Sequence, residues 1–119
     1  MKGLLIRTPW INLILNGQKK WEMRSRDTTH RGEFLLIQSG SGLIVGQANL
    51  VGTQKLHPAQ FGQTKRYHCV DDLALLNRWC YAWILEDIQK FDTPIPYTHP
   101  QGAVIWVQLP SFEGAHFMR

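Results

Sequence analysis

The hydrophobic positions near the start of the chain first form a run and then spread around a helical face. Residues 2–7 (KGLLIR) are a short branched apolar run, which predicts a strand. The following segment, TPWINLILNG, has the broad apolar face of a short helix. Thr8 has the side chain of an N-cap, Pro9 suits the first helical position, and Gly17 can adopt the left-handed conformation that ends a helix.

Residues 20–25 change to a period of two, which is typical of a half-buried strand. Trp21 and Met23 share one face. The opposite face carries the charged side chains Lys20, Glu22 and Arg24. A purely solvated charged segment would not contain large apolar residues at every second position. The pattern therefore leaves two interpretations, a polar hairpin or one wall of a site.

The middle of the chain predicts a pair of strands and then short helices. Residues 33–39 and 43–53 are apolar enough for two strands, and the glycines between them suit a tight turn. The RDTTHRG run before them predicts another turn. Residues 57–76 mix proline, glutamine and charge with a few leucines, which predicts one or two short helices.

The last third predicts two further strands. Residues 79–91 alternate and predict a long strand. Residues 92–102 carry three prolines and predict a loop, because proline cannot donate to a strand ladder. Residues 103–109 predict a final strand, and residues 110–119 predict a fraying tail.

About six strands with short helices between them, on so small a chain, predict an α+β fold of one domain over residues 1–119. The expected architecture is a small β-barrel whose mouth is covered by the short helices. An α+β sandwich with one helical layer is the alternative.

Composition narrows the class of protein only a little. Thirteen Lys and Arg against nine Asp and Glu give a net charge of +4, which favours polyanionic partners. The apolar runs are too short for a spanning helix, and the first residues lack the pattern of a secretory signal, so we expect a cytoplasmic protein. Cys69 and Cys80 lack metal-ligand spacing and are expected to be buried reduced thiols, with no metal and no cofactor.

The helix-to-strand segment carries a recognisable motif. Gly17, Lys19, Glu22 and Arg24 read as GxKxxExR. In its context, between TPWINLILNG and RSRDTTHRGEFLLI, this motif resembles the signature of the ASCH family, small domains related to the PUA barrel. LIVGQANLVG is similar to the next strand of that family, and HPQGAVIWVQL is similar, less specifically, to its closing strand. The resemblance implies a PUA-like barrel with a cleft for RNA or a nucleotide.

The residues themselves also indicate a site. Glu22 and Arg24 are two apart on one strand, so they point to the same face, where the guanidinium can hold the carboxylate. Lys19 follows the helix-ending glycine and can lean over the same cavity, as a base or an anion contact. The competing interpretation is an ordinary ion cluster at a barrel rim. The motif context favours the site.

Further candidates surround this cluster. Trp10 is expected at the mouth of the cavity, either as a wall or as a hydrophobic anchor, and His99 stands before the closing strand. Arg26 and Arg31 are candidate phosphate contacts, and the same possibility holds for Arg7, Lys65 and Arg66. The remaining histidines are spread along the chain without ligand spacing. Trp79, Tyr81 and Trp83 form an aromatic stripe, interpreted as core packing for at least two of them, with a base-stacking platform as the alternative.

Three functions remain open from the sequence. The first is an RNA-binding or nucleotide-binding module that uses Lys19, Glu22 and Arg24. The second is a metal-independent hydrolase acting on RNA or on a modified nucleoside such as N4-acetylcytidine, with Lys19 as base and Glu22 orienting it or activating water. The third is a protein-interaction adaptor.

The hydrolase reading meets one departure from the family pattern. The amidohydrolase branch that the resemblance implies uses a lysine and a threonine on the motif strand, and here Glu22 takes the place of the threonine. Thr28 and Thr29 are nearby replacements for that hydroxyl.

Overall fold

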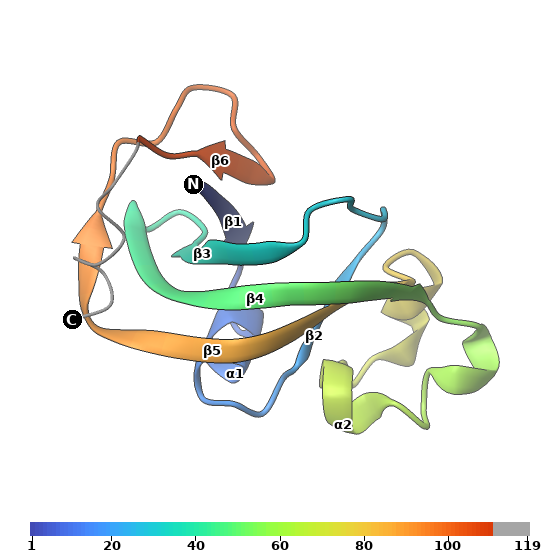
Figure 1. Ribbon diagram of the computed structural model, residues 1–119. Coiled ribbons are helices and arrows are strands. Elements are labelled where there is room, and N and C mark those ends of the chain that lie inside the picture. Colours follow the sequence, from blue (N-terminus) through green and yellow to red (C-terminus); the bar gives the residue numbers. More distant parts are fainter. Residues whose placement is uncertain (111–119) are drawn as a thin grey trace.

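A computed structural model describes residues 1–110, and its strands form one strongly curled sheet (Figure 1). The six strands lie in the order β2-β5-β4-β3-β1-β6. Their bounds are β1 Lys2–Ile6, β2 Trp21–Arg24, β3 Gly32–Gln38, β4 Leu43–Lys55, β5 Tyr81–Pro96 and β6 Trp106–Gln108. The helical segments are α1 Trp10–Leu15, η1 Pro58–Gln60, α2 Lys65–His68 and η2 Leu73–Asn77. The predicted barrel with short helices is therefore confirmed as a half-barrel.

The chain connectivity brings the first and last described strands together. β1 pairs in parallel with β3, and α1 and β2 lie in the crossover between them. β6 then adds to the free edge of β1 in antiparallel register, with Leu4 opposite Trp106. β2 pairs with β5 at the opposite end of the sheet, with Glu22 opposite Trp83.

Irregular pairing between β4 and β5 accounts for the curl. The register between these two long strands shifts at three places, and Asp87 has a φ of 52° at one of them. Such bulges bend a strand and increase its twist. The side-chain amide of Asn49 donates to Asp87 Oδ2 at 2.9 Å and holds this irregular point. The sheet wraps around α1 in consequence, as Figure 1 shows.

Both faces of the sheet are apolar around β1 and β3. Leu4 and Leu36 belong to the core cluster that also contains the buried residues of α1, whereas Leu5 and Leu35 belong to a second cluster on the other face. This arrangement explains the unbroken apolar runs LLI and FLLI, because alternate residues are buried on opposite sides.

The segment between β4 and β5 forms a separate small layer over β2. It contains three short helical turns, where the sequence predicted one or two helices. Its apolar residues pack on Met23 and Ala82, and Tyr67 stacks on Trp21 with ring centroids 4.8 Å apart. β2 is thereby covered on the Trp21 face, so its charged face is free to turn toward the centre of the molecule.

The start of the first helix and the end of β5 differ from the prediction. The helix begins at Trp10 and Thr8 makes no capping bond, because the Ile11 amide already donates to the carbonyl of Arg7 at 3.0 Å. β5 continues through part of the proline segment to Pro96. At this end β5 pairs only with β4. Residues 91–94 lie between two paired positions, so the missing amide hydrogen of Pro94 removes no hydrogen bond from the ladder.

The closing strand is shorter than predicted. β6 covers only Trp106–Gln108, and residues 103–105 approach it as an irregular segment. The carbonyl of Ile105 accepts from the amide of Leu5 at 2.9 Å, so this segment is still fixed to β1. Of the predicted fraying tail, residues 111–119 lie outside the described residues.

Cys69 and Cys80 are free thiols, but each is half-buried rather than buried. Within residues 1–110, every helix is too short or too polar to traverse a lipid bilayer.

Candidate functional site

Lys19 is placed by the short connection between α1 and β2. Gly17, with a φ of 86°, ends the helix as the sequence predicted. The amide of Lys19 then returns to the helix and donates to the carbonyl of Leu13 at 2.9 Å, while the amide of Lys20 donates to Tyr67 at 2.9 Å. These two bonds fix the backbone on both sides of the Lys19 side chain, so its direction is set before any ligand arrives.

The ammonium of Lys19 is almost completely buried. The residue is 1% exposed, and its Nζ donates to the carbonyl of His68. Nζ also lies 4.9 Å from the ring centroid of Trp10 and 4.0 Å from Glu22 Oε1. Burial lowers the pKa of Lys19 below its usual value of 10.5, and the neighbouring carboxylate of Glu22 only partly opposes this effect.

Glu22 and Arg24 form the second half of the cluster. Glu22 is 5% exposed, and its Oε2 accepts from Arg24 Nε at 2.9 Å and lies 2.8 Å from Arg24 Nη2. Arg24 Nη2 also donates to the carbonyl of Leu5 at 2.7 Å, and the guanidinium lies 5.5 Å from the centroid of Trp83. Oε1 of Glu22 accepts no hydrogen bond from the described residues, so it remains available to a ligand donor.

These three charged side chains line one large cavity, Glu22 and Arg24 from one face of β2 and Lys19 from the connection before that strand. The cavity has a volume of about 1040 Å³. Its other walls come from β1 and the turn to α1, from α1, β2, the turn after β3, the segments on either side of η2 and the segment between β5 and β6. They are Leu5, Arg7, Thr8, Trp10, Met23, Ser39, Gly40, Gly42, Val70, Arg78, Trp79, Tyr97, His99 and residues 103–105.

Two tryptophans form an aromatic wall of this cavity. Trp10, a predicted site residue, meets Trp79 edge to face with ring centroids 6.5 Å apart. Trp79 therefore lines the cavity and is not part of the strand that carries Tyr81 and Trp83. Trp83 is 3% exposed and Tyr81 packs against the same core, which confirms the core interpretation for these two. The stripe itself is not a stacking platform.

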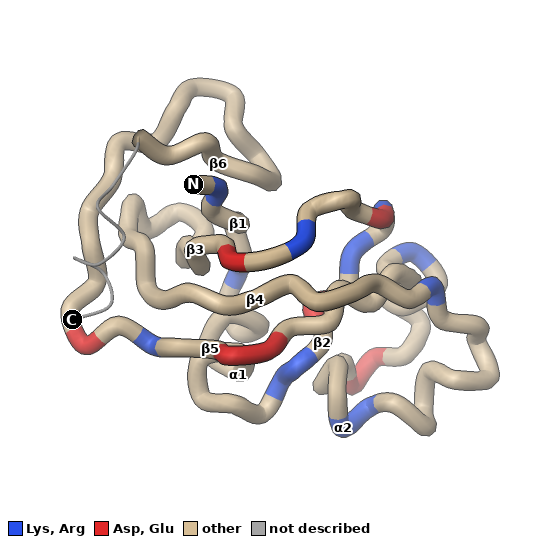
Figure 2. Tube along the Cα trace, viewed as in Figure 1, with Lys and Arg blue, Asp and Glu red and all other residues tan. Residues whose placement is uncertain are grey.

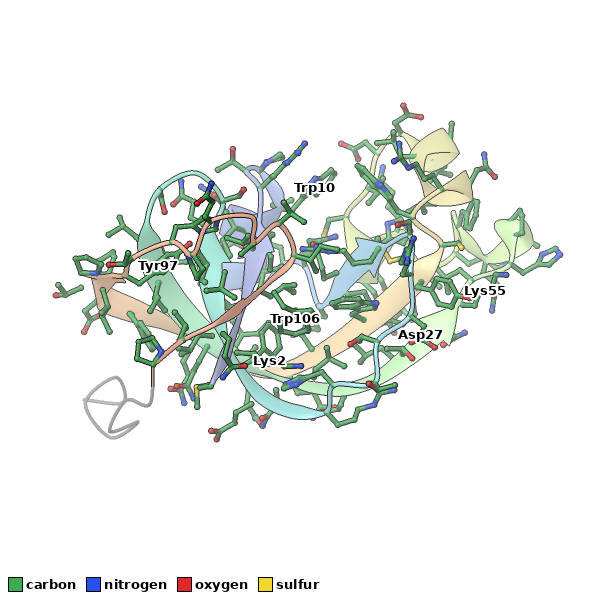
Figure 3. All side chains as sticks on the ribbon, turned by 90° about the horizontal axis from the view of Figure 1, so that it is seen from above. Lys2, Trp10, Asp27, Lys55, Tyr97 and Trp106 are labelled. Carbon is green, nitrogen blue, oxygen red and sulfur yellow. The ribbon has the colours of Figure 1, made fainter. Side chains whose placement is uncertain are left out.

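His99, another predicted site residue, lies on the wall near β6. Its Nε2 donates to the carbonyl of Ala103 at 2.9 Å, and its Nδ1 forms a hydrogen bond with the hydroxyl of Tyr97 at 2.8 Å. Burial raises the pKa of Tyr97. In the view of Figure 3, Tyr97 and Trp10, which line this cavity, lie higher in the picture than Lys2 and Asp27, which do not line it.

Arg26 and Arg31 are not part of this cavity. Both are exposed, and the guanidinium of Arg31 donates to the carbonyls of Thr28 and His30, at 2.9 and 2.7 Å. Thr28 and Thr29 line a separate cavity of about 420 Å³ with Lys2 and Trp106. They are therefore not placed to supply the missing hydroxyl, and Thr8 and Ser39 are the Ser and Thr hydroxyls that line the large cavity.

His68 is the main support that the sequence did not reveal. It is fully buried, its Nδ1 accepts from the amide of Val70 at 2.9 Å, and its Nε2 donates to the carbonyl of Phe61 at 2.8 Å. Its own carbonyl holds Lys19. Nothing in the sequence distinguishes His68 from the other histidines, because these contacts come from residues whose positions only the fold defines.

Arg78 and Tyr97 are cavity residues that sequence reasoning also missed. Arg78 directly precedes Trp79, and this pair of a basic and an aromatic residue is the sequence feature that could have indicated a binding residue. Tyr97 lies in the segment interpreted as a proline loop. Among the described residues, no group of three or more His, Cys, Asp or Glu side chains is arranged to hold a metal ion.

Comparison with solved structures confirms the fold. The crystal structure of ASCH from Zymomonas mobilis is 14% identical, with a TM-score of 0.71, and the match covers 98% of this chain and 92% of that one. Two mutants of the same protein match at 15% identity, with TM-scores of 0.73 and 0.72; the matches cover 98% of this chain and 93% and 95% of theirs. No curated protein matches the chain.

The sequence profile described as the ASCH domain matches residues 4–95. This range includes the GxKxxExR motif and every charged side chain of the large cavity. The chain therefore belongs to the ASCH domain family.

Proposed function

We propose that this protein is an RNA-binding or nucleotide-binding module that receives its ligand in the large cavity. The observation that carries the proposal is that a buried hydrogen-bond donor, the Lys19 ammonium, lies beside a buried acceptor, the Glu22 carboxylate. Lys19 and Glu22 are both buried, Nζ lies 4.0 Å from Oε1, and both side chains line the cavity. Family membership and the PUA-like fold support the same class of ligand.

A nucleobase edge matches this arrangement. The Watson–Crick edge of a base presents an acceptor next to an N–H donor, and single-stranded RNA leaves that edge free. Lys19 keeps donors beyond its bond to His68, and Oε1 of Glu22 can accept from the base. Trp10 and Trp79 offer aromatic surface beside this pair.

The first test measures binding of short single-stranded RNA and of nucleosides to the wild type and to Glu22→Gln. The amide retains the shape but loses the charge, so affinity should fall by about 0.5 to 1.5 kcal/mol, the net value of a typical hydrogen bond. Glu33→Gln is the control, because Glu33 is an exposed strand carboxylate outside the cavity. Equal affinities in both variants would contradict a role for Glu22 in recognition.

Salt dependence separates RNA binding from protein binding. If phosphates are contacted, the logarithm of affinity should fall linearly with the logarithm of salt concentration, at about 0.7 per phosphate for a single strand. Absence of RNA binding at low salt would favour the adaptor function.

A hydrolase is the second candidate, because Lys19 combines a lowered pKa with a position on the cavity wall. If Glu22 activates water, Glu22→Gln should keep affinity and lower turnover of RNA or acetylated cytidine by about 100-fold or more. Turnover that is abolished in Lys19→Ala would support this function. No turnover by the wild type would leave Glu22 as a recognition residue.

A further inference from the structure

The large cavity carries a marked excess of positive charge. Four of its lining side chains are basic, Arg7, Lys19, Arg24 and Arg78, and one, Glu22, is acidic. Basic positions elsewhere are spread over several elements of the trace, as Figure 2 shows. The charge of the cavity therefore distinguishes it from the rest of the surface, and a cavity lined by one sign of charge raises the local concentration of oppositely charged ligands.

The basic residues of the cavity divide into two groups. Lys19 and Arg24 are committed to Glu22 and to backbone carbonyls. The guanidinium groups of Arg7 and Arg78 have no hydrogen bond or ion pair within residues 1–110, although both line the cavity. The charged groups of the inner cluster are thus held mainly by one another and by the backbone, and the guanidinium groups without such partners are those of Arg7 and Arg78.

The position of these arginines along the chain brings them to the aromatic wall. Arg7 leads into the helix that begins at Trp10, and Arg78 directly precedes Trp79. The two tryptophan rings meet, so the chain segments that follow β1 and η2 both reach this aromatic wall, and each contributes one of the arginines to the cavity lining. Arginine presents several donors in a planar fork that matches a phosphate.

We infer that Arg7 and Arg78 bind the phosphate group of a nucleotide whose base occupies the Lys19–Glu22 pair. This inference rests on the proposed function and assigns it a ligand class, a phosphorylated nucleotide rather than a neutral nucleoside. The volume of about 1040 Å³ is at the upper end of small-molecule sites and accommodates base, ribose and phosphate together.

The experiment is a binding cycle measured by calorimetry. The probes are the four ribonucleosides, their 5′-monophosphates and 3′-monophosphates, and a dinucleoside monophosphate that lacks a terminal phosphate. In the wild type a monophosphate should bind about tenfold more tightly than its nucleoside, or better, because hydrogen bonds to charged groups are the stronger ones. The dinucleoside monophosphate distinguishes a diester of an RNA backbone from a terminal phosphate.

The decisive variant is Arg7→Gln combined with Arg78→Gln. It should reduce the preference for the phosphate, measured as the ratio of monophosphate to nucleoside affinity, to about twofold or less. Arg26→Gln combined with Arg66→Gln removes the same total charge from exposed positions outside the cavity and should keep the preference. A global charge effect would weaken both double variants equally and would overturn the inference.

Failure of the inference and failure of the proposed function give different results. Equal binding of nucleoside and nucleotide by the wild type overturns the role of the two arginines and leaves the base site intact. A phosphate preference that persists in the Arg7/Arg78 double variant also overturns the role of the two arginines. If no probe binds, the phosphate assignment is wrong, and titration with short RNA then decides the proposed function by itself.

Discussion

At the scale of single residues, the position of Lys19 depends on a buried histidine. Both ring nitrogens of His68 are used by backbone groups, which fixes the neutral tautomer with the proton on Nε2. Its carbonyl then receives the ammonium of Lys19. A change in the protonation of His68 would disturb the backbone bond from Val70 and, through it, the support of Lys19.

This dependence predicts a loss of stability in acid. Burial lowers the pKa of His68 below 6.5, so between the folded pKa and 6.5 the unfolded chain binds more protons. The contribution of His68 to the free energy of unfolding is complete above pH 6.5. It is lost as the pH falls from 6.5 to the pKa of the folded state, at no more than about 1.4 kcal/mol per pH unit. Urea unfolding at several pH values should show this slope in the wild type and a smaller one in His68→Gln.

The exposed His57 supplies the control for this experiment. Its ring caps η1 by accepting from the amide of Ala59 at 3.1 Å, and Asn can make the same bond. His57→Asn should therefore retain the slope of the wild type. An identical slope in His68→Gln would show that another group causes the acid sensitivity.

The sequence was sufficient for the charged half of the site and insufficient for the rest. Alternation along one strand placed Glu22 and Arg24 on a common face, and the helix-ending Gly17 explained why Lys19 joins them. Those relations are local. His68, Arg78 and Tyr97 reach the cavity through contacts between distant segments, which a periodic pattern does not encode.

At the scale of elements, sequence patterns predicted which strands exist better than where they end. β5 was predicted to end at residue 91, but β4 offers it a partner as far as Pro96. Pairing is a property of two strands, so the pattern of one strand does not determine its length. The same reason explains why the apolar pattern predicts strand at residues 103–105, although β6 begins only at Trp106.

The close packing of β4 on β5 predicts a large effect at Gly46. A Cβ at this position would lie 2.4 Å from the carbonyl oxygen of Gln89 and 2.9 Å from Leu15 Cδ2. Because one of these neighbours is backbone, Gly46→Ala should lower the free energy of unfolding by about 1 to 3 kcal/mol. Chemical denaturation measures this directly.

Gly52, on the same strand, is the matched control. A Cβ there meets nothing within 4 Å. Gly52→Ala should change stability by no more than about 0.5 kcal/mol in either direction. Similar losses in the two variants would indicate a general cost of alanine in β4 and would refute the steric explanation.

At the scale of the whole molecule, Arg24 links the two halves of the curled sheet. β2 and β1 stand far apart in the strand order, yet Arg24 on β2 donates to the carbonyl of Leu5 on β1. Trp83 on β5 stacks on Trp106 of β6 with centroids 5.8 Å apart and supports the same closure. The residue that orients Glu22 therefore also helps to hold the half-barrel in shape.

This double role predicts that Arg24→Lys affects both ligand binding and stability. Lysine keeps the charge but lacks the fork that reaches Glu22 and Leu5 together. Unfolding free energy should fall by about 1 to 3 kcal/mol, and affinity for RNA or nucleotide should fall with it. Denaturation and titration of the same preparation test this, with Arg26→Lys as the exposed control. Weaker binding at unchanged stability would separate the two roles.

The pairing of β1 with β6 has a consequence for the order in which the molecule acquires its shape. Residue 2 lies opposite residue 108, so this ladder closes nearly the whole described chain into one loop. Such distant contacts have the largest loop-closure cost and slow folding. The segment that leads into β6 is also one wall of the cavity. We therefore expect the central strands to associate before β6 joins β1, so that the cavity gains its last side late in folding.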